Sequence, residues 1–100
     1  MIVFCDPTGG HVELRDADVF TSFHAEAPEG ASRTDISRLL GTPEPDQAAH
    51  VWVPIALVEQ SAGDASSDWA DGFRSMVEYA VSKGWTNDAG DMLLAHVETI

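Results

Sequence analysis

The sequence has few basic residues: five Lys and Arg are set against seventeen Asp and Glu, which gives a formal net charge of −12. Proteins bind nucleic acids largely through cations that displace counterions from the phosphates, and anionic membrane surfaces also attract basic segments. The charge balance therefore excludes both kinds of partner for binding through the chain's own charge. The acidic residues are spread along the whole chain, as is typical of a solubilising surface, and a basic protein partner is compatible with them.

Cysteine is almost absent as well. Cys5 is the one cysteine of the chain, so no intrachain disulfide can form, which is typical of a reducing compartment. Cys5 also precedes Asp6 in a strongly acidic chain, and nearby carboxylates disfavour the thiolate that a nucleophilic cysteine requires. We therefore interpret Cys5 as a packing residue rather than a catalytic one.

Long apolar runs are also lacking. No run approaches the roughly 20 residues that are needed to span a bilayer. The first residues, Met1 to Phe4, carry no basic stretch like that of a signal peptide. Together with the single cysteine, these features predict a cytoplasmic protein.

The chain lacks the short motifs that accompany common catalytic and cofactor sites. It contains no HExxH, no closely spaced pair of histidines, no Walker-type phosphate loop, no GxSxG elbow and no Ser-x-x-Lys. Pairs of carboxylates are frequent in so acidic a chain and therefore carry no information. These absences predict a protein without a cofactor or a metal site, and they favour a non-enzymatic role.

Apolar residues, by contrast, are sufficient for one core. They make up 44% of the 100 residues, which is typical of a single globular domain over residues 1–100. In the first half, residue alternation and turn residues predict three antiparallel strands in succession, at 2–5, 11–14 and 19–25. Ser32 and Asp35 have the spacing of a capping box, which predicts the start of a helix that ends at Gly41.

The second half predicts a strand at 49–53, a helix at 55–62 that follows Pro54, and a long helix from Ser66 to Gly84. A longer strand that continues through Val58 is the alternative to the helix at 55–62. The long helix has one apolar stripe, formed by Trp69, Phe73, Met76, Val77 and Ala80. Residues 92–99 are compatible with a helix or a strand, and a strand is expected because the segment is short and follows a glycine turn. The order βββαβααβ predicts an α+β fold with one mainly antiparallel sheet and the helices on one face.

The C-terminal half resembles a group of small uncharacterised bacterial proteins. The matching segments are Val51–Pro54, Ser67–Phe73, Met76, Tyr79–Ala80, Ser82–Trp85 and Ala95–Glu98. The resemblance supports the final strand. The group has no assigned activity, so the resemblance implies nothing about function.

Histidines recur on one side of the predicted strands. Alternate residues of a strand share a face, and the plain apolar residues of each strand are expected to face the helices. The side chains expected on the open face, which is the sheet face that the helices do not cover, are Phe20, His24, His50, Trp52 and His96. Three imidazoles are a chemically sound metal site, but no sequence spacing supports one, and three unrelated half-exposed histidines are the favoured interpretation.

These features leave three functional hypotheses open. The first is a non-enzymatic protein-interaction module, a homodimer that covers the aromatic and histidine side chains of the open face. The second is a small-molecule-binding protein or small enzyme whose pocket is lined by Trp52, Trp85 and the histidines. The third is an acidic regulator that binds a basic protein.

Overall fold

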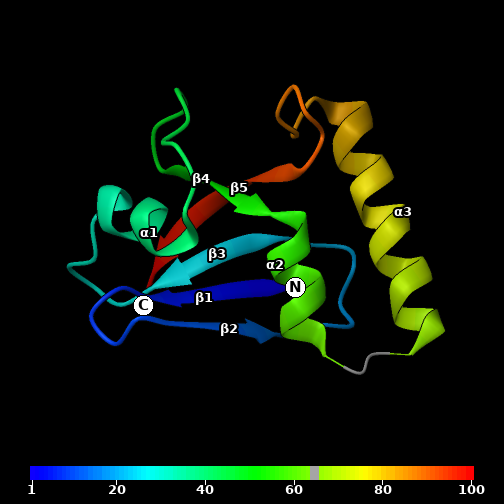
Figure 1. Cartoon of the computed structure of the whole chain (residues 1–100), viewed down its shortest axis with the longest axis horizontal. Helices are drawn as coiled ribbons and strands as arrows, with labels where there is room; N and C mark the ends of the chain where they lie inside the picture. The colour runs from blue at the N-terminus through cyan, green and yellow to red at the C-terminus, as the bar shows by residue number, and fades with distance from the viewer. Residues whose placement is uncertain (64–65) are drawn as a thin grey trace.

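The computed structural model describes residues 1–63 and 66–100, and in this part of the chain the elements follow one another in the predicted order βββαβααβ (Figure 1). The strands are β1 (Ile2–Asp6), β2 (His11–Arg15), β3 (His24–Ala27), β4 (His50–Pro54) and β5 (Met92–Thr99). The helices are α1 (Arg33–Leu40), α2 (Ile55–Ala62) and α3 (Ser67–Lys83).

The strands form one mixed sheet with the spatial order β2-β1-β3-β5-β4. The outer pairs, β1 with β2 and β4 with β5, are antiparallel, whereas β3 is parallel to both of its neighbours. The prediction of a mainly antiparallel sheet was therefore wrong. The first hairpin formed as expected, but β3 crosses to the far side of β1, and β5 is inserted between β3 and β4.

The third strand also differs from its prediction. It covers only His24–Ala27, not 19–25, because the preceding segment wraps around the beginning of β1. The Met1 amino group donates hydrogen bonds to the backbone oxygens of Val19 (2.7 Å) and Ser22 (2.8 Å) in this segment. Of the apolar residues that suggested a strand here, Phe20 packs against Trp69 of α3, whereas Val19 is exposed.

The helices begin and end where the sequence predicts. The Ser32 side chain accepts a hydrogen bond from the Asp35 backbone at 3.0 Å, and Ser66 accepts one from Trp69 at 3.2 Å. Gly41 and Gly84 follow α1 and α3 with φ of 72° and 76°, a left-handed conformation that glycine adopts without a Cβ clash. These caps satisfy backbone groups that the helix ends leave unpaired.

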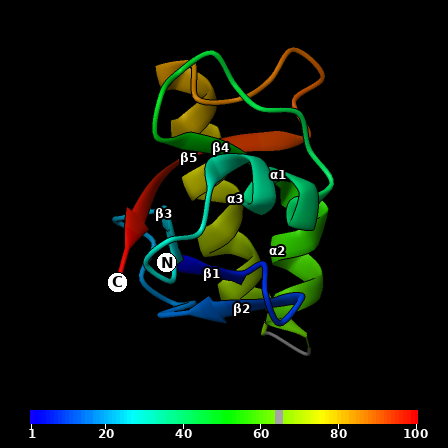
Figure 2. The same ribbon diagram turned by 90° about the vertical axis from the view of Figure 1, so that its left-hand side faces the viewer.

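Helices α1 and α2 cover one face of the sheet, as Figures 1 and 2 show from two directions. Helix α3 lies beside α2, past the ends of β1 and β3. The sheet contributes Val3, Cys5, Ala25, Ala27, Val51, Val53, Leu93 and Ala95 to the buried core, and the helices contribute Ile36, Leu40, Val58 and Phe73. The alternate side chains of the strands form the open face. Among the described residues, no helix has the length and apolar character required to cross a membrane.

Candidate functional site

Two surfaces carry side chains that are suited to binding a ligand or a partner protein: the open face of the sheet and a pocket beside α3. On the open face, His50 and His96 are Cα partners on β4 and β5, and their rings meet edge to face with centroids 5.4 Å apart. Ala25 of β3 and Val97 of β5 are Cα partners in the parallel pair. His24 and His96 directly precede them, so these two histidines lie side by side on neighbouring strands. The three histidines therefore form a row across adjacent strands.

The row has polar and aromatic neighbours on the same face. His24 Nε2 lies 3.1 Å from Glu26 Oε2 and 3.4 Å from Glu98 Oε2. The His50 ring nitrogen Nδ1 lies 2.8 Å from the Ala48 backbone oxygen, an acceptor, so this nitrogen carries the proton. Trp52 is half-buried, two residues along β4 from His50.

One group on the open face has the geometry of metal ligands. His24, Glu26 and Glu98 offer a ring nitrogen and two carboxylate oxygens that all lie within 4.8 Å of one another. We call these three residues the His–Glu cluster. The cluster differs from the three-imidazole site considered from the sequence, because only His24 belongs to both sets.

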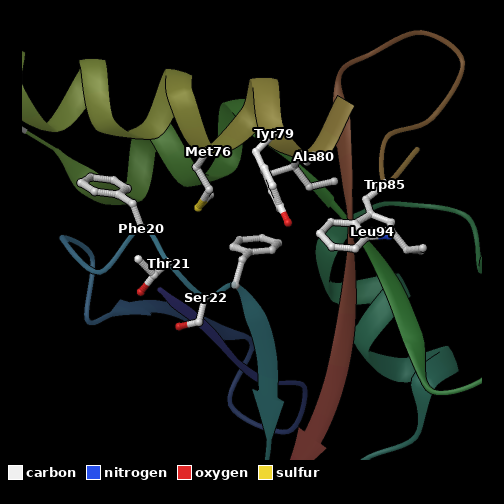
Figure 3. A pocket seen from close by; sticks show the side chains of 10 residues that line it. Phe20, Thr21, Ser22, Met76, Tyr79, Ala80, Trp85 and Leu94 are labelled. Atoms are coloured by element: carbon white, nitrogen blue, oxygen red, sulfur yellow. The ribbon is translucent and has the colours of Figure 1, made fainter. Parts of the chain in front are cut away.

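The second surface is a pocket between α3, the segment before β3 and the start of β5 (Figure 3). We call it the α3 pocket, and its cavity volume is about 310 Å³. It is lined by Phe20, Thr21, Ser22, Phe23, Met76, Tyr79, Ala80, Trp85, Leu93 and Leu94. A volume of this size is at the lower end of the range of roughly 300–1,000 Å³ found for small-molecule sites.

Each wall of the α3 pocket has a definite origin in the fold. Met76, Tyr79 and Ala80 project from the side of α3 that faces the strands, with the Tyr79 hydroxyl directed away from the helix (Figure 3). Trp85 follows the Gly84 cap, and its backbone oxygen accepts a hydrogen bond from the Leu94 backbone at 2.8 Å. This bond holds the Trp85 side of the pocket against the first half of β5.

The aromatic side chains at the mouth of the α3 pocket are exposed. Tyr79 is 57% exposed and Trp85 is 45% exposed, and their rings meet edge to face with centroids 5.9 Å apart. Water therefore contacts a pair of large rings that no described residue covers. Exposed apolar surface of this kind is a frequent mark of a binding site.

The open face lacks one residue that was predicted there. Phe20 lies outside β3, and its ring packs against α3, with the Trp69 ring centroid 6.2 Å away. At Gly72 of α3, an added Cβ would overlap the Phe20 ring, with Cδ2 and Cζ at 2.8 Å. The absence of a side chain at Gly72 is what allows Phe20 to approach the helix and form a wall of the α3 pocket.

The pocket predicted from the sequence was also composed differently. Trp85 lines the α3 pocket, as expected, but the histidines and Trp52 do not. Trp52 is the Cα partner of Leu94, so it lies next to a lining residue without being one. The α3 pocket thus borders the open face at Leu94 but is formed by other side chains.

Sequence reasoning missed several members of both surfaces. Met76 was assigned to the core stripe of α3, and Tyr79 was not considered, although an aromatic residue just outside an apolar stripe is a usable signal. Glu26 was missed because the third strand was expected to end at residue 25. The alternation of His24, Ala25, Glu26 and Ala27 in the sequence would have revealed it.

Cys5 does not belong to either surface. It is fully buried in the core, and burial raises the pKa of its thiol to about 11. A thiol with so high a pKa stays protonated at neutral pH, and protonated thiols are poor nucleophiles. The interpretation of Cys5 as a packing residue agrees with this placement.

Comparisons of the chain with protein-family models, with curated proteins and with solved structures found no match. The resemblance of the C-terminal half to small bacterial proteins therefore stays an expectation from the sequence.

Proposed function

We propose that this protein is a non-enzymatic binding module that takes up a small, largely apolar molecule in the α3 pocket. The observation that carries the proposal is the combination of a formed cavity with exposed aromatic rings at its mouth. Tyr79 and Trp85 present ring faces that a flat apolar ligand would cover, and Met76 supplies a flexible thioether floor. The hydroxyls of Thr21, Ser22 and Tyr79 are the polar groups available to orient such a ligand.

The composition of the lining favours an uncharged ligand. Aromatic and aliphatic side chains dominate the walls, and transfer of an ion from water to such surroundings is costly unless a partner charge compensates. The chain's net charge of −12 further disfavours anions. A neutral ring system of modest size fits both the volume and the chemistry of the α3 pocket.

A neutral fluorescent probe tests this proposal. N-phenyl-1-naphthylamine should bind with enhanced emission, and Trp85→Ala should weaken its binding at least about fivefold, since loss of one large aromatic contact costs about 1 kcal/mol or more. The measurement is a fluorescence titration at neutral pH.

Val81→Ala is the matched control, because Val81, like Trp85, is an exposed apolar residue, at 56%, but it lies on α3 outside the lining. Its probe affinity should equal that of the wild type. A wild type that does not enhance probe emission, or equal losses in Trp85→Ala and Val81→Ala, would contradict the pocket as a ligand site.

A second candidate function is self-association through the open face. Ile2, Phe4, Trp52 and Leu94 lie on this face half-buried, and α1 and α2 pack on the other side of the sheet. A second copy related by a two-fold axis is the commonest way to cover such a face in a soluble protein. Under this proposal the interface includes Trp52 and at least one of His24, His50 and His96.

Light scattering checks this second proposal. The wild type should be dimeric at high micromolar concentration and neutral pH, and Trp52→Ala should be mainly monomeric, because buried aromatic residues dominate interface energies. Val81→Ala serves as the control, since it shortens an exposed apolar side chain of α3, outside the open face, and should leave the dimer intact. A monomeric wild type, or a Trp52→Ala variant that dimerises unchanged, contradicts the dimer.

A further inference from the structure

The two parallel strands at the centre of the sheet bring together an imidazole and two carboxylates from distant parts of the sequence. Glu26 of β3 and Glu98 of β5 are Cα partners, and His24 precedes Glu26 by two residues on the same face. His24 Nε2 lies between the carboxylates, 3.1 Å from one Oε2 atom and 3.4 Å from the other. Ligand atoms around a tetrahedral zinc ion, at metal distances near 2.0–2.1 Å, are about 3.3 Å apart.

The two neighbouring carboxylates of the His–Glu cluster would be stabilised by a bound cation. Like charges directly opposite each other on neighbouring strands destabilise a sheet, and the Glu26 side chain is only 17% exposed, which limits screening by water. All five Lys and Arg residues of the chain have partners elsewhere. These contacts are Arg15 with Glu13, Arg33 with Glu44, Arg38 with Asp35, Arg74 with Asp71, and Lys83 over the Tyr79 ring.

Arg15 shows how one of these cations is engaged. Arg15 lies on the same sheet face, but its guanidinium covers the Phe4 ring at 4.1 Å and pairs with Glu13 at 3.0 Å. The contacts that the structure gives the two glutamates within the described residues are those to His24. One imidazole carries at most one positive charge and cannot neutralise both carboxylates, whereas a divalent cation can.

We propose that the His–Glu cluster is a binding site for a divalent transition metal, with zinc the best match. One imidazole nitrogen and two carboxylate oxygens are ligands that zinc accepts, and three protein ligands leave one position open to water or to another donor. His96 and His50 lie next in the row across the sheet. The bound ion would tie β3 to β5 on the open face. The site is separate from the α3 pocket and does not depend on the ligand proposed there.

Calorimetric titration with zinc chloride is the direct test. The wild type should bind one zinc ion per chain, and both His24→Gln and Glu98→Gln should bind it at least about tenfold more weakly, since each removes a ligand. His11→Gln is the matched control: His11 is an exposed histidine at the edge strand β2, outside the cluster. It should bind zinc as the wild type does.

Nitrogen-15 spectra of the histidine side chains give a second readout on the unaltered protein, so that a variant that fails to fold does not decide the matter. Addition of zinc should shift the Nε2 resonance of His24 and leave that of His11 in place. The proposal is overturned if the wild type shows no saturable one-to-one binding, if His11→Gln loses as much affinity as His24→Gln, or if the His24 resonance does not respond to zinc.

Discussion

Phe73→Ala should lower the free energy of unfolding by about 3–5 kcal/mol, the usual range for removal of a buried phenylalanine. Phe73 is 4% exposed, and its ring stacks on that of Trp69 with centroids 5.0 Å apart and planes 15° apart. Alanine would leave a cavity between α3 and the rest of the core and would remove this stacking contact. Urea unfolding followed by circular dichroism measures the change.

Glu78→Ala provides the comparison on the same helix. Glu78 is exposed on the polar side of α3, so its loss should change the free energy of unfolding by no more than about 0.5 kcal/mol. Similar small losses at both positions would mean that α3 is not anchored through Phe73.

Gly72→Ala should also destabilise the fold, by about 1–3 kcal/mol, although alanine normally favours a helix over glycine by about 1 kcal/mol. The reason is the Phe20 ring, which occupies the space where the new Cβ would lie. The ring must move away from α3, and this movement removes one wall of the α3 pocket. Unfolding in urea measures the loss of stability.

The same substitution in a Phe20→Ala background separates this contact from a general effect on the helix. Without the ring, Gly72→Ala should be neutral or stabilising, because only the helix propensity of alanine remains. Destabilisation of equal size in both backgrounds would show that contact with Phe20 is not its cause.

Local signals in the sequence predicted the elements well. The serine caps at 32 and 66 and the glycines at 41 and 84 mark the ends of α1 and α3, since capping depends on backbone groups a few residues away. The pairing of the strands was harder to predict from the sequence. The partners of β3 depend on where the chain crosses the sheet. The alternation of residues within one strand does not indicate which strands lie next to it.

The misplaced third strand shows how an apolar pattern can mislead. Phe20 and Phe23 were expected on opposite faces of one strand, yet both line the α3 pocket. An apolar residue in a sequence signals burial, not the element that buries it. Residue alternation correctly predicted that His24, His50 and His96 share one sheet face. The pairing of Glu26 with Glu98 could not be predicted in this way, because it depends on the register of two parallel strands.

The central position of β5 has a consequence for how the sheet assembles. Its register with β3 joins Ala25 to Val97, and closing so long a loop costs conformational entropy before any contact is gained. The β1–β2 hairpin closes a short loop and has little of this entropic cost. Strand β4 has to wait for β5, because β5 is its one partner in the described sheet. Until β5 arrives, β3 and β4 each present an unpaired edge to other chains. Aggregation during refolding is therefore a hazard that this topology carries and that the high negative charge of the chain counteracts.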